Sequence, residues 1–136
     1  MKAIRVRLQP LSPFRLDLTA WALRRRPRNL IDRWDGERYS RILTVDGTPL
    51  HLAIRQTAPS DQPEIECVCT CFNRAPRDVQ VAAAVKRLLG LNVDMSGFQR
   101  VARRDSRLRA LVGRFAGFHP PRFPTLFEAA VNAICC

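Results

Sequence analysis

The spacing of apolar residues changes at Pro76, and this change limits the folds open to the chain. In the first half, apolar residues alternate with polar ones, which is the period of a β-strand with one solvated face. In the second half they recur every three or four residues, as in amphipathic helices. Strands in one half and helices in the other are typical of α+β proteins. We therefore predict an α+β fold, an antiparallel sheet with packed helices, over residues 1–92, followed by the start of a helical domain over residues 93–136.

Three segments carry the strand pattern. Residues 3–8 and 64–71 each place their apolar side chains on one face. Residues 38–56 predict two strands joined at Asp46-Gly47, because these two residue types tolerate the positive φ angles of a tight hairpin turn. The sheet should therefore contain at least one hairpin.

One helical pattern lies between the first two strand segments, and the others follow the last strand. Residues 16–26 predict a short helix that Asp17 caps, and residues 76–89 predict an amphipathic helix that ends at Gly90. Residues 95–115 predict one or two further helices.

The final helix has the clearest start signal, because Thr125 and Glu128 occupy the S/T-x-x-E positions of a capping box. A broad apolar stripe follows, wide enough to contact two or more neighbours. Its members are Leu126, Phe127, Ala130, Val131 and Ile134. The pattern reaches Cys136 without a glycine, a basic last turn or a polar tail. We expect the first helix of a truncated helical core, with part of the stripe exposed and able to self-associate through residues 126–136.

The chain is strongly basic. It has 23 Lys+Arg against 12 Asp+Glu, a formal net charge of +11 and a pI near 11.1. Most of these cations are arginines, whose planar guanidinium groups bind phosphate oxygens in pairs. The charge therefore favours a nucleic-acid partner. The alternative is an arginine-rich solvated surface without a specific partner.

A group of arginines could contact a phosphate backbone. They would form one stripe if residues 95–115 were a single helix, and a break near Asp105 would disrupt it. The group comprises Arg100, Arg103, Arg104 and Arg107. The alternative is that they cover a solvated helix face.

Trp21 lies just before the basic stretch RRRPR, on the same predicted helix face as Leu18 and Ala22. A tryptophan beside basic residues can stack on a nucleic-acid base. The alternative is that Trp21 anchors the helix to the core.

The cysteines and histidines form no recognisable metal or catalytic pattern. Cys67, Cys69 and Cys71 share the core side of a strand, with no second Cys or His pair at zinc-ligand spacing. We interpret them as buried thiols of a protein in a reducing compartment. His51 and His119 have no Ser, Cys or carboxylate partner at a spacing that indicates a triad. We predict no metal, no cofactor and no catalytic residue within these 136 residues.

The sequence also lacks membrane and secretion signals. No apolar run approaches the roughly 18 residues of a membrane span, and the N-terminus lacks the apolar core of a signal peptide. We expect a cytoplasmic protein.

The order of these elements, and above all the segment GFHPPRFPTLFEAAVNAICC, resembles the helix-hairpin-helix DNA glycosylase superfamily, specifically the bacterial 3-methyladenine DNA glycosylase II family. That family carries a phrase Pro-x-x-Leu/Phe-Glu-x-x-x-x-x-Ile after an N-terminal α+β domain. In this chain the phrase falls on Pro124, Leu126, Phe127, Glu128 and Ile134. The resemblance is strongest over residues 118–136, moderate over 13–47 and loose between them.

The resemblance implies the N-terminal part of a base-excision repair enzyme that binds double-stranded DNA and removes alkylated bases. It also implies that Trp21, within about one residue, lines the base pocket. The family's helix-hairpin-helix motif and catalytic Asp have no counterpart here, so we expect these residues alone to be inactive. The rival interpretation is a complete, non-enzymatic nucleic-acid-binding module whose curved sheet holds the backbone. A third is an interaction domain whose charge is incidental.

Overall fold

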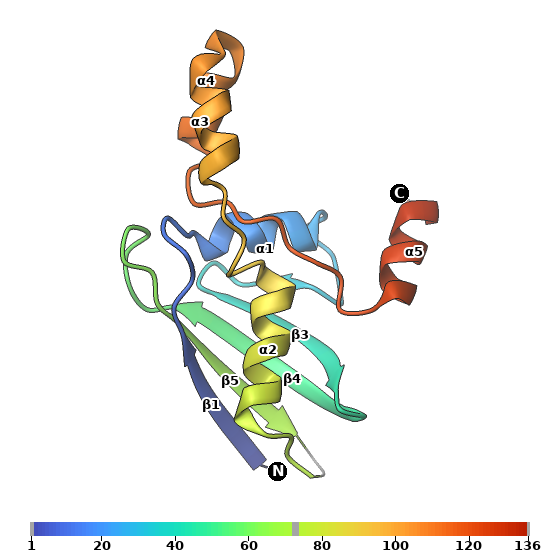
Figure 1. Ribbon diagram of the computed structural model, residues 1–136. Helices are drawn as coiled ribbons and strands as arrows, with labels where there is room; N and C mark the ends of the chain where they lie inside the picture. Colours follow the sequence, from blue (N-terminus) through green and yellow to red (C-terminus); the bar gives the residue numbers. More distant parts are fainter. Residues whose placement is uncertain (1, 72–73, 136) are drawn as a thin grey trace.

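The computed structural model describes residues 2–71 and 74–135. In these ranges the chain forms a five-stranded antiparallel sheet in the order β1-β5-β4-β3-β2, together with five helices (Figure 1). The strands are β1 (Lys2–Leu8), β2 (Arg33–Trp34), β3 (Arg38–Val45), β4 (Thr48–Gln56) and β5 (Ile65–Cys71). The predicted α+β class is therefore confirmed, with the N-terminal strand paired to β5 rather than to its neighbour in sequence.

The hairpin between β3 and β4 is the one that the sequence predicts. Val45 pairs with Thr48 across a turn of two residues. Asp46 and Gly47 have φ angles of 50° and 73°, the positive values that a tight hairpin turn requires.

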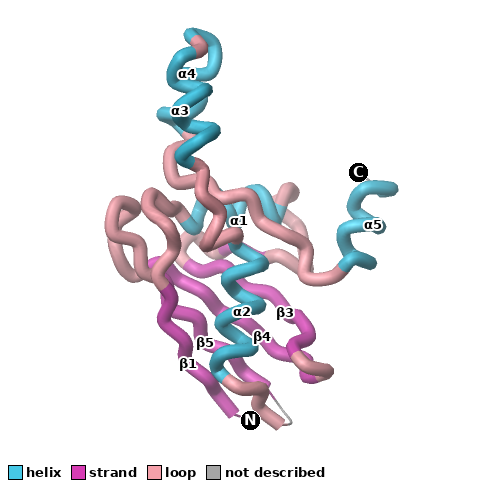
Figure 2. The backbone as a smooth tube through the Cα atoms, in the orientation of Figure 1, coloured by secondary structure: helices cyan, strands magenta, loops and turns pink. Residues whose placement is uncertain are grey.

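The sheet has one covered face and one open face (Figure 2). Helices α1 (Leu16–Arg24) and α2 (Asp78–Leu89) lie over the covered face. Strand residues from all four long strands and the helix stripe Val81, Val85, Leu88 and Leu89 form a single buried core there. The alternation that predicts strands thus places every second side chain in this core.

Helix α1 meets the core by a different face from the one that its sequence indicates. Leu16, Thr19, Ala20 and Leu23 are buried, whereas Trp21 is 58% exposed. Asp17 is not the cap, because Arg15 occupies the N-cap position and its guanidinium instead binds the Asp17 carboxylate. The prediction of Asp17 as the cap is therefore wrong.

Helices α3 (Ser96–Arg104) and α4 (Ser106–Arg114) project from the rest of the molecule as an arm (Figure 1). Asp105 separates them and caps α4, since its carboxylate accepts hydrogen bonds from the backbone N–H groups of Arg107 and Leu108 at 2.7 and 3.3 Å. The predicted break near Asp105 is confirmed.

The segment after α4 returns to the core and is fixed there. Gly90 ends α2, as predicted, and it has the left-handed conformation, with φ 63°. The Arg122 N–H donates to the Leu88 carbonyl at 3.0 Å. The buried His119 ring places Nδ1 2.9 Å from the Gly90 carbonyl oxygen and Nε2 3.0 Å from that of Pro13. His119 is thus a structural link between three segments.

Helix α5 (Leu126–Cys135) stands at the edge of the molecule (Figure 1). The Thr125 hydroxyl accepts a hydrogen bond from the Glu128 N–H at 3.1 Å, which is half of the predicted capping box. The apolar stripe lies in solvent, with Leu126 85% and Ile134 84% exposed. The prediction of an exposed stripe is confirmed. None of the helices in the described ranges has the length and apolarity needed to cross a bilayer.

Candidate nucleic-acid interface

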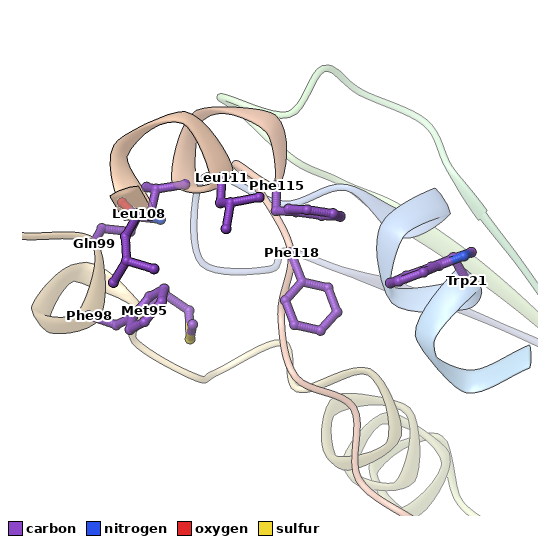
Figure 3. Close-up of a pocket in the computed structure, with 9 residues that line it drawn as sticks. Trp21, Met95, Phe98, Gln99, Leu108, Leu111, Phe115 and Phe118 are labelled. Carbon is purple, nitrogen blue, oxygen red and sulfur yellow. The ribbon is translucent and has the colours of Figure 1, made fainter. Parts of the chain in front are cut away.

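An apolar pocket lies between α1 and the arm. It encloses about 350 Å³. Aromatic, aliphatic and thioether side chains from four segments surround it, with a single polar residue among them (Figure 3). The lining residues are Trp21, Met95, Phe98, Gln99, Leu108, Leu111, Val112, Phe115 and Phe118. Such a pocket suits a flat apolar or aromatic ligand.

Trp21 forms one wall of this pocket. Because α1 buries its other face, the indole points away from the core and stacks on Phe115, with ring centroids 6.2 Å apart and planes inclined by 29°. In Figure 3, Phe115 and Phe118 lie between Trp21 and the side chains of α3. The alternative that Trp21 anchors the core is therefore wrong, because the side chain is largely exposed.

The arginine stripe is divided between two helices. Arg100, Arg103 and Arg104 lie on α3, and Arg107 lies beyond the break, on α4. The Arg109 guanidinium donates to the Arg103 carbonyl at 3.1 Å, so the start of α4 is tied back to the end of α3. All the predicted backbone-contact arginines are exposed on the arm, but they do not form one continuous stripe.

A buried ion-pair network links the sheet to α5, and sequence reasoning did not find it. The Arg41 side chain is only 2% exposed, and its Nη2 donates to both Glu128 carboxylate oxygens at 2.9 and 3.1 Å. Its Nη1 donates to Asp32 at 3.1 Å, and the Tyr39 hydroxyl donates to the same Asp32 oxygen. The sequence did contain one indication of this network, because Arg41 occupies a position of β3 that faces the core.

Burial and charge shift the pKa values in this network. Burial and the negative charge of Asp32 raise the pKa of Tyr39, so its hydroxyl remains a donor. Burial acts to lower the pKa of Arg41, but the groups around it, Tyr39, Asp32 and Glu128, outweigh burial and raise it. The network therefore holds a permanent cation between two carboxylates.

The open face of the sheet carries a row of charges across four strands. Arg38, Arg55, Glu66 and Arg7 are successive partners in the β3, β4, β5 and β1 ladders. Arg55 donates to Glu66 through Nε at 3.1 Å and Nη2 at 2.9 Å, and Arg5 approaches the second carboxylate oxygen at 3.3 Å. Burial acts to raise the pKa of Glu66, but these hydrogen bonds and charges hold it below its ordinary value. The arginines outnumber the carboxylate, so the row is basic.

The cysteines of β5 and His119 are buried, apart from the pocket and from the open sheet face. Cys67, Cys69 and Cys71 are buried, as predicted. The hydrogen bond with Cys69 and burial raise the pKa of Cys67, which keeps that thiol protonated. His51 is exposed on the open sheet face, and His119 is the buried link described above.

Comparison with known proteins finds a likeness in structure. No family model and no curated protein matches the chain. Among solved structures, the chain is similar to the 3-methyladenine DNA-glycosylase from Archaeoglobus fulgidus, with a TM-score of 0.69 and 20% sequence identity. The match covers 95% of this chain and 43% of that one, in its N-terminal part. The chain thus spans less than half the length of the protein that it matches, and at this identity the two share a fold: the predicted resemblance is confirmed at the level of structure.

Proposed function

We propose that this chain is the N-terminal part of a DNA repair glycosylase that excises alkylated bases, and that it supplies scaffold and DNA-binding surface without the catalytic Asp. The observation that carries the proposal is the structural likeness, which extends over 95% of the chain and therefore includes both the sheet and the arm. The basic charge and the apolar pocket beside Trp21 support it.

In this proposal residues 1–92 are the α+β domain and residues 93–136 begin a helical domain. The arm and α5 support the division, because both expose apolar side chains that a helical core would cover. These include Val101 on the arm and Leu126 and Ile134 on α5. Double-stranded DNA would meet Arg100, Arg103, Arg104 and Arg107, and the pocket beside Trp21 would receive the planar damaged base.

Trp21 fluorescence tests the pocket. Trp34 is the other tryptophan in the sequence, so a Trp34→Phe background leaves Trp21 as the sole indole emitter. Titration with 3-methyladenine should quench this emission, because the base would stack on the indole. A Phe115→Ala variant, which removes the aromatic ring beside Trp21 in the pocket lining, should weaken binding. Equal quenching by free ribose, or none at millimolar base, would contradict the pocket assignment.

Release of base from alkylated DNA tests the catalytic part of the proposal. We expect the 136-residue chain to bind duplex DNA in a salt-sensitive manner and to release no 3-methyladenine. Measurable release would show that these residues contain the catalytic group.

A non-enzymatic nucleic-acid-binding module is the second candidate, and the basic row on the open sheet face favours it. Arg38 and Arg7 lie at the two ends of that row. Substituting both with glutamine should abolish duplex binding if the sheet face is the interface. If the first proposal is correct, the Arg7→Gln/Arg38→Gln variant should lose less affinity for duplex DNA than the Arg100→Gln/Arg103→Gln variant, which removes the same number of charges from the arm.

A further inference from the structure

A second groove, which the proposed function leaves without a role, runs between α5 and the end of α1 with the segment after it. It encloses about 560 Å³. Phe123, Phe127 and Val131 line it from α5 and the approach to it, and arginines line it from the opposite segment. Those arginines are Arg24, Arg25, Arg26 and Arg28. The groove therefore combines aromatic surface with concentrated positive charge.

The charge of this arginine segment is not neutralised. None of the ion pairs among the described residues involves residues 24–28. The two carboxylates in the groove, Asp32 and Glu128, are both bound to the buried Arg41. The exposed guanidinium groups are thus available to an anionic ligand.

The arginine segment has a fixed backbone. Arg25 has a φ of 54°, and its N–H donates to the Trp21 carbonyl at 3.0 Å. The Asn29 amide donates to the Arg24 carbonyl at 2.9 Å and accepts from the Ile31 N–H at 2.8 Å. This scaffold places the Arg25 guanidinium carbon 6.0 Å from the centroid of the Phe123 ring. A ligand would meet arginines and aromatic rings that are already side by side.

We propose that this groove binds a single strand of DNA, with phosphates on Arg25, Arg26 and Arg28 and unstacked bases on Phe123 and Phe127. Planar guanidinium groups bind phosphate oxygens in pairs, and exposed aromatic rings stack only on bases that a duplex does not already stack. An acidic peptide would satisfy the charge but would leave the rings without planar partners. The inference goes beyond the proposed function and rests on it only in taking DNA as the polyanion.

Fluorescence anisotropy of the 136-residue chain with a labelled twelve-nucleotide oligo(dT) tests the groove. The triple variant Arg25→Gln/Arg26→Gln/Arg28→Gln should bind with a weaker salt dependence. The negative slope of log affinity against log salt should become shallower by about 2, since each phosphate contact on a single strand contributes about 0.7. Phe127→Ala should weaken binding about tenfold with the slope unchanged. Phe127 is 77% exposed, so this truncation leaves the core intact.

The matched control changes the same number of charges elsewhere. Arg74, Arg77 and Arg87 are exposed on α2 and the segment before it, and their replacement by glutamine should alter oligo(dT) affinity less than threefold. Equal loss in the control would show non-specific charge attraction and overturn the proposal. Displacement of oligo(dT) by polyglutamate as effectively as by unlabelled oligo(dT) would overturn it in favour of an acidic peptide.

Two further outcomes separate this proposal from the proposed function. If the groove variants bind oligo(dT) normally while the unaltered chain binds duplex DNA, the groove assignment fails and the proposed function stands. If the unaltered chain binds neither probe at low salt, both fail.

Discussion

Glu66 lies on the open, charged face of the sheet, but its own side chain is buried. It lies on the open face of the sheet, as the strand period predicts, yet it is only 4% exposed because arginines from β1 and β4 cover it. The sequence could predict the face on which Glu66 lies. It could not predict the burial, which depends on β1 lying beside β5.

The lowered pKa of Glu66 predicts a pH-dependent stability. A carboxylate whose pKa is lower in the folded state stabilises the protein above its unfolded pKa, and this contribution disappears as the pH falls through the folded value. Glu66→Gln should therefore lower the free energy of unfolding at pH 7, and the deficit should shrink below about pH 4. Urea unfolding followed by circular dichroism across this range measures it. A deficit that stays constant with pH would contradict the ion-pair account.

His119 is expected to contribute to stability rather than to chemistry. Its ring meets two carbonyl oxygens and lies edge-on to Phe14, with centroids 5.2 Å apart. His119→Ala should lower the free energy of unfolding by about 3 kcal/mol, because it leaves a cavity and removes partners from buried carbonyls. His51→Ala, at an exposed position, is the control and should change stability by less than about 0.5 kcal/mol. Equal effects of the two changes would contradict this role.

At the scale of the element, α5 depends on a partner that is distant in sequence. The capping-box pattern correctly predicts where the helix begins, and Thr125 makes the expected hydrogen bond. It also predicts that the Glu128 side chain turns back to the helix start, whereas that carboxylate binds Arg41 on the sheet. A local pattern specifies the start of a helix, but a contact over 87 positions depends on the assembled sheet.

Removing the Glu128 carboxylate should therefore release α5 while leaving the sheet folded. The helix has no buried side chain among its described residues, and the Glu128–Arg41 ion pair joins it to the sheet. Glu128→Ala should accelerate amide hydrogen exchange across residues 127–135, with β3–β5 unchanged. Glu37→Ala, an exposed carboxylate on the turn before β3, is the control. Unchanged exchange in α5 would show that other contacts hold the helix.

At the scale of the molecule, the period of the sequence predicts the strands, the hairpin and the amphipathic stripe of α2, because these depend on neighbours within a few residues. The apolar pocket was not predictable in the same way. It requires the outward face of α1 to meet the arm, and these segments are distant in sequence. The nearby arginines and the family resemblance identified Trp21 as a candidate for contact with a base, and the structure places its side chain on the pocket wall.

The exposed apolar surface predicts association of the isolated chain. Full burial of each large side chain of the α5 stripe would contribute roughly 1.5–3 kcal/mol to the free energy of association. The exposed stripe therefore favours contact with other apolar surfaces. The chain should bind a hydrophobic dye or self-associate in sedimentation experiments. Deletion of residues 125–136 should reduce both while the sheet retains its circular dichroism. A dye-silent monomer would contradict this expectation.

The pairing of β1 with β5 also has a consequence for synthesis. The ribosome synthesises β1 first. The hairpin of β3 and β4 must then be made before β5, which is the partner strand of β1, emerges. During that interval β1 has no neighbour along the sheet and presents Val6 and Leu8 without cover. Arg5 and Arg7, which alternate with these residues, place positive charge on the waiting strand and disfavour its pairing with the same strand of another nascent chain.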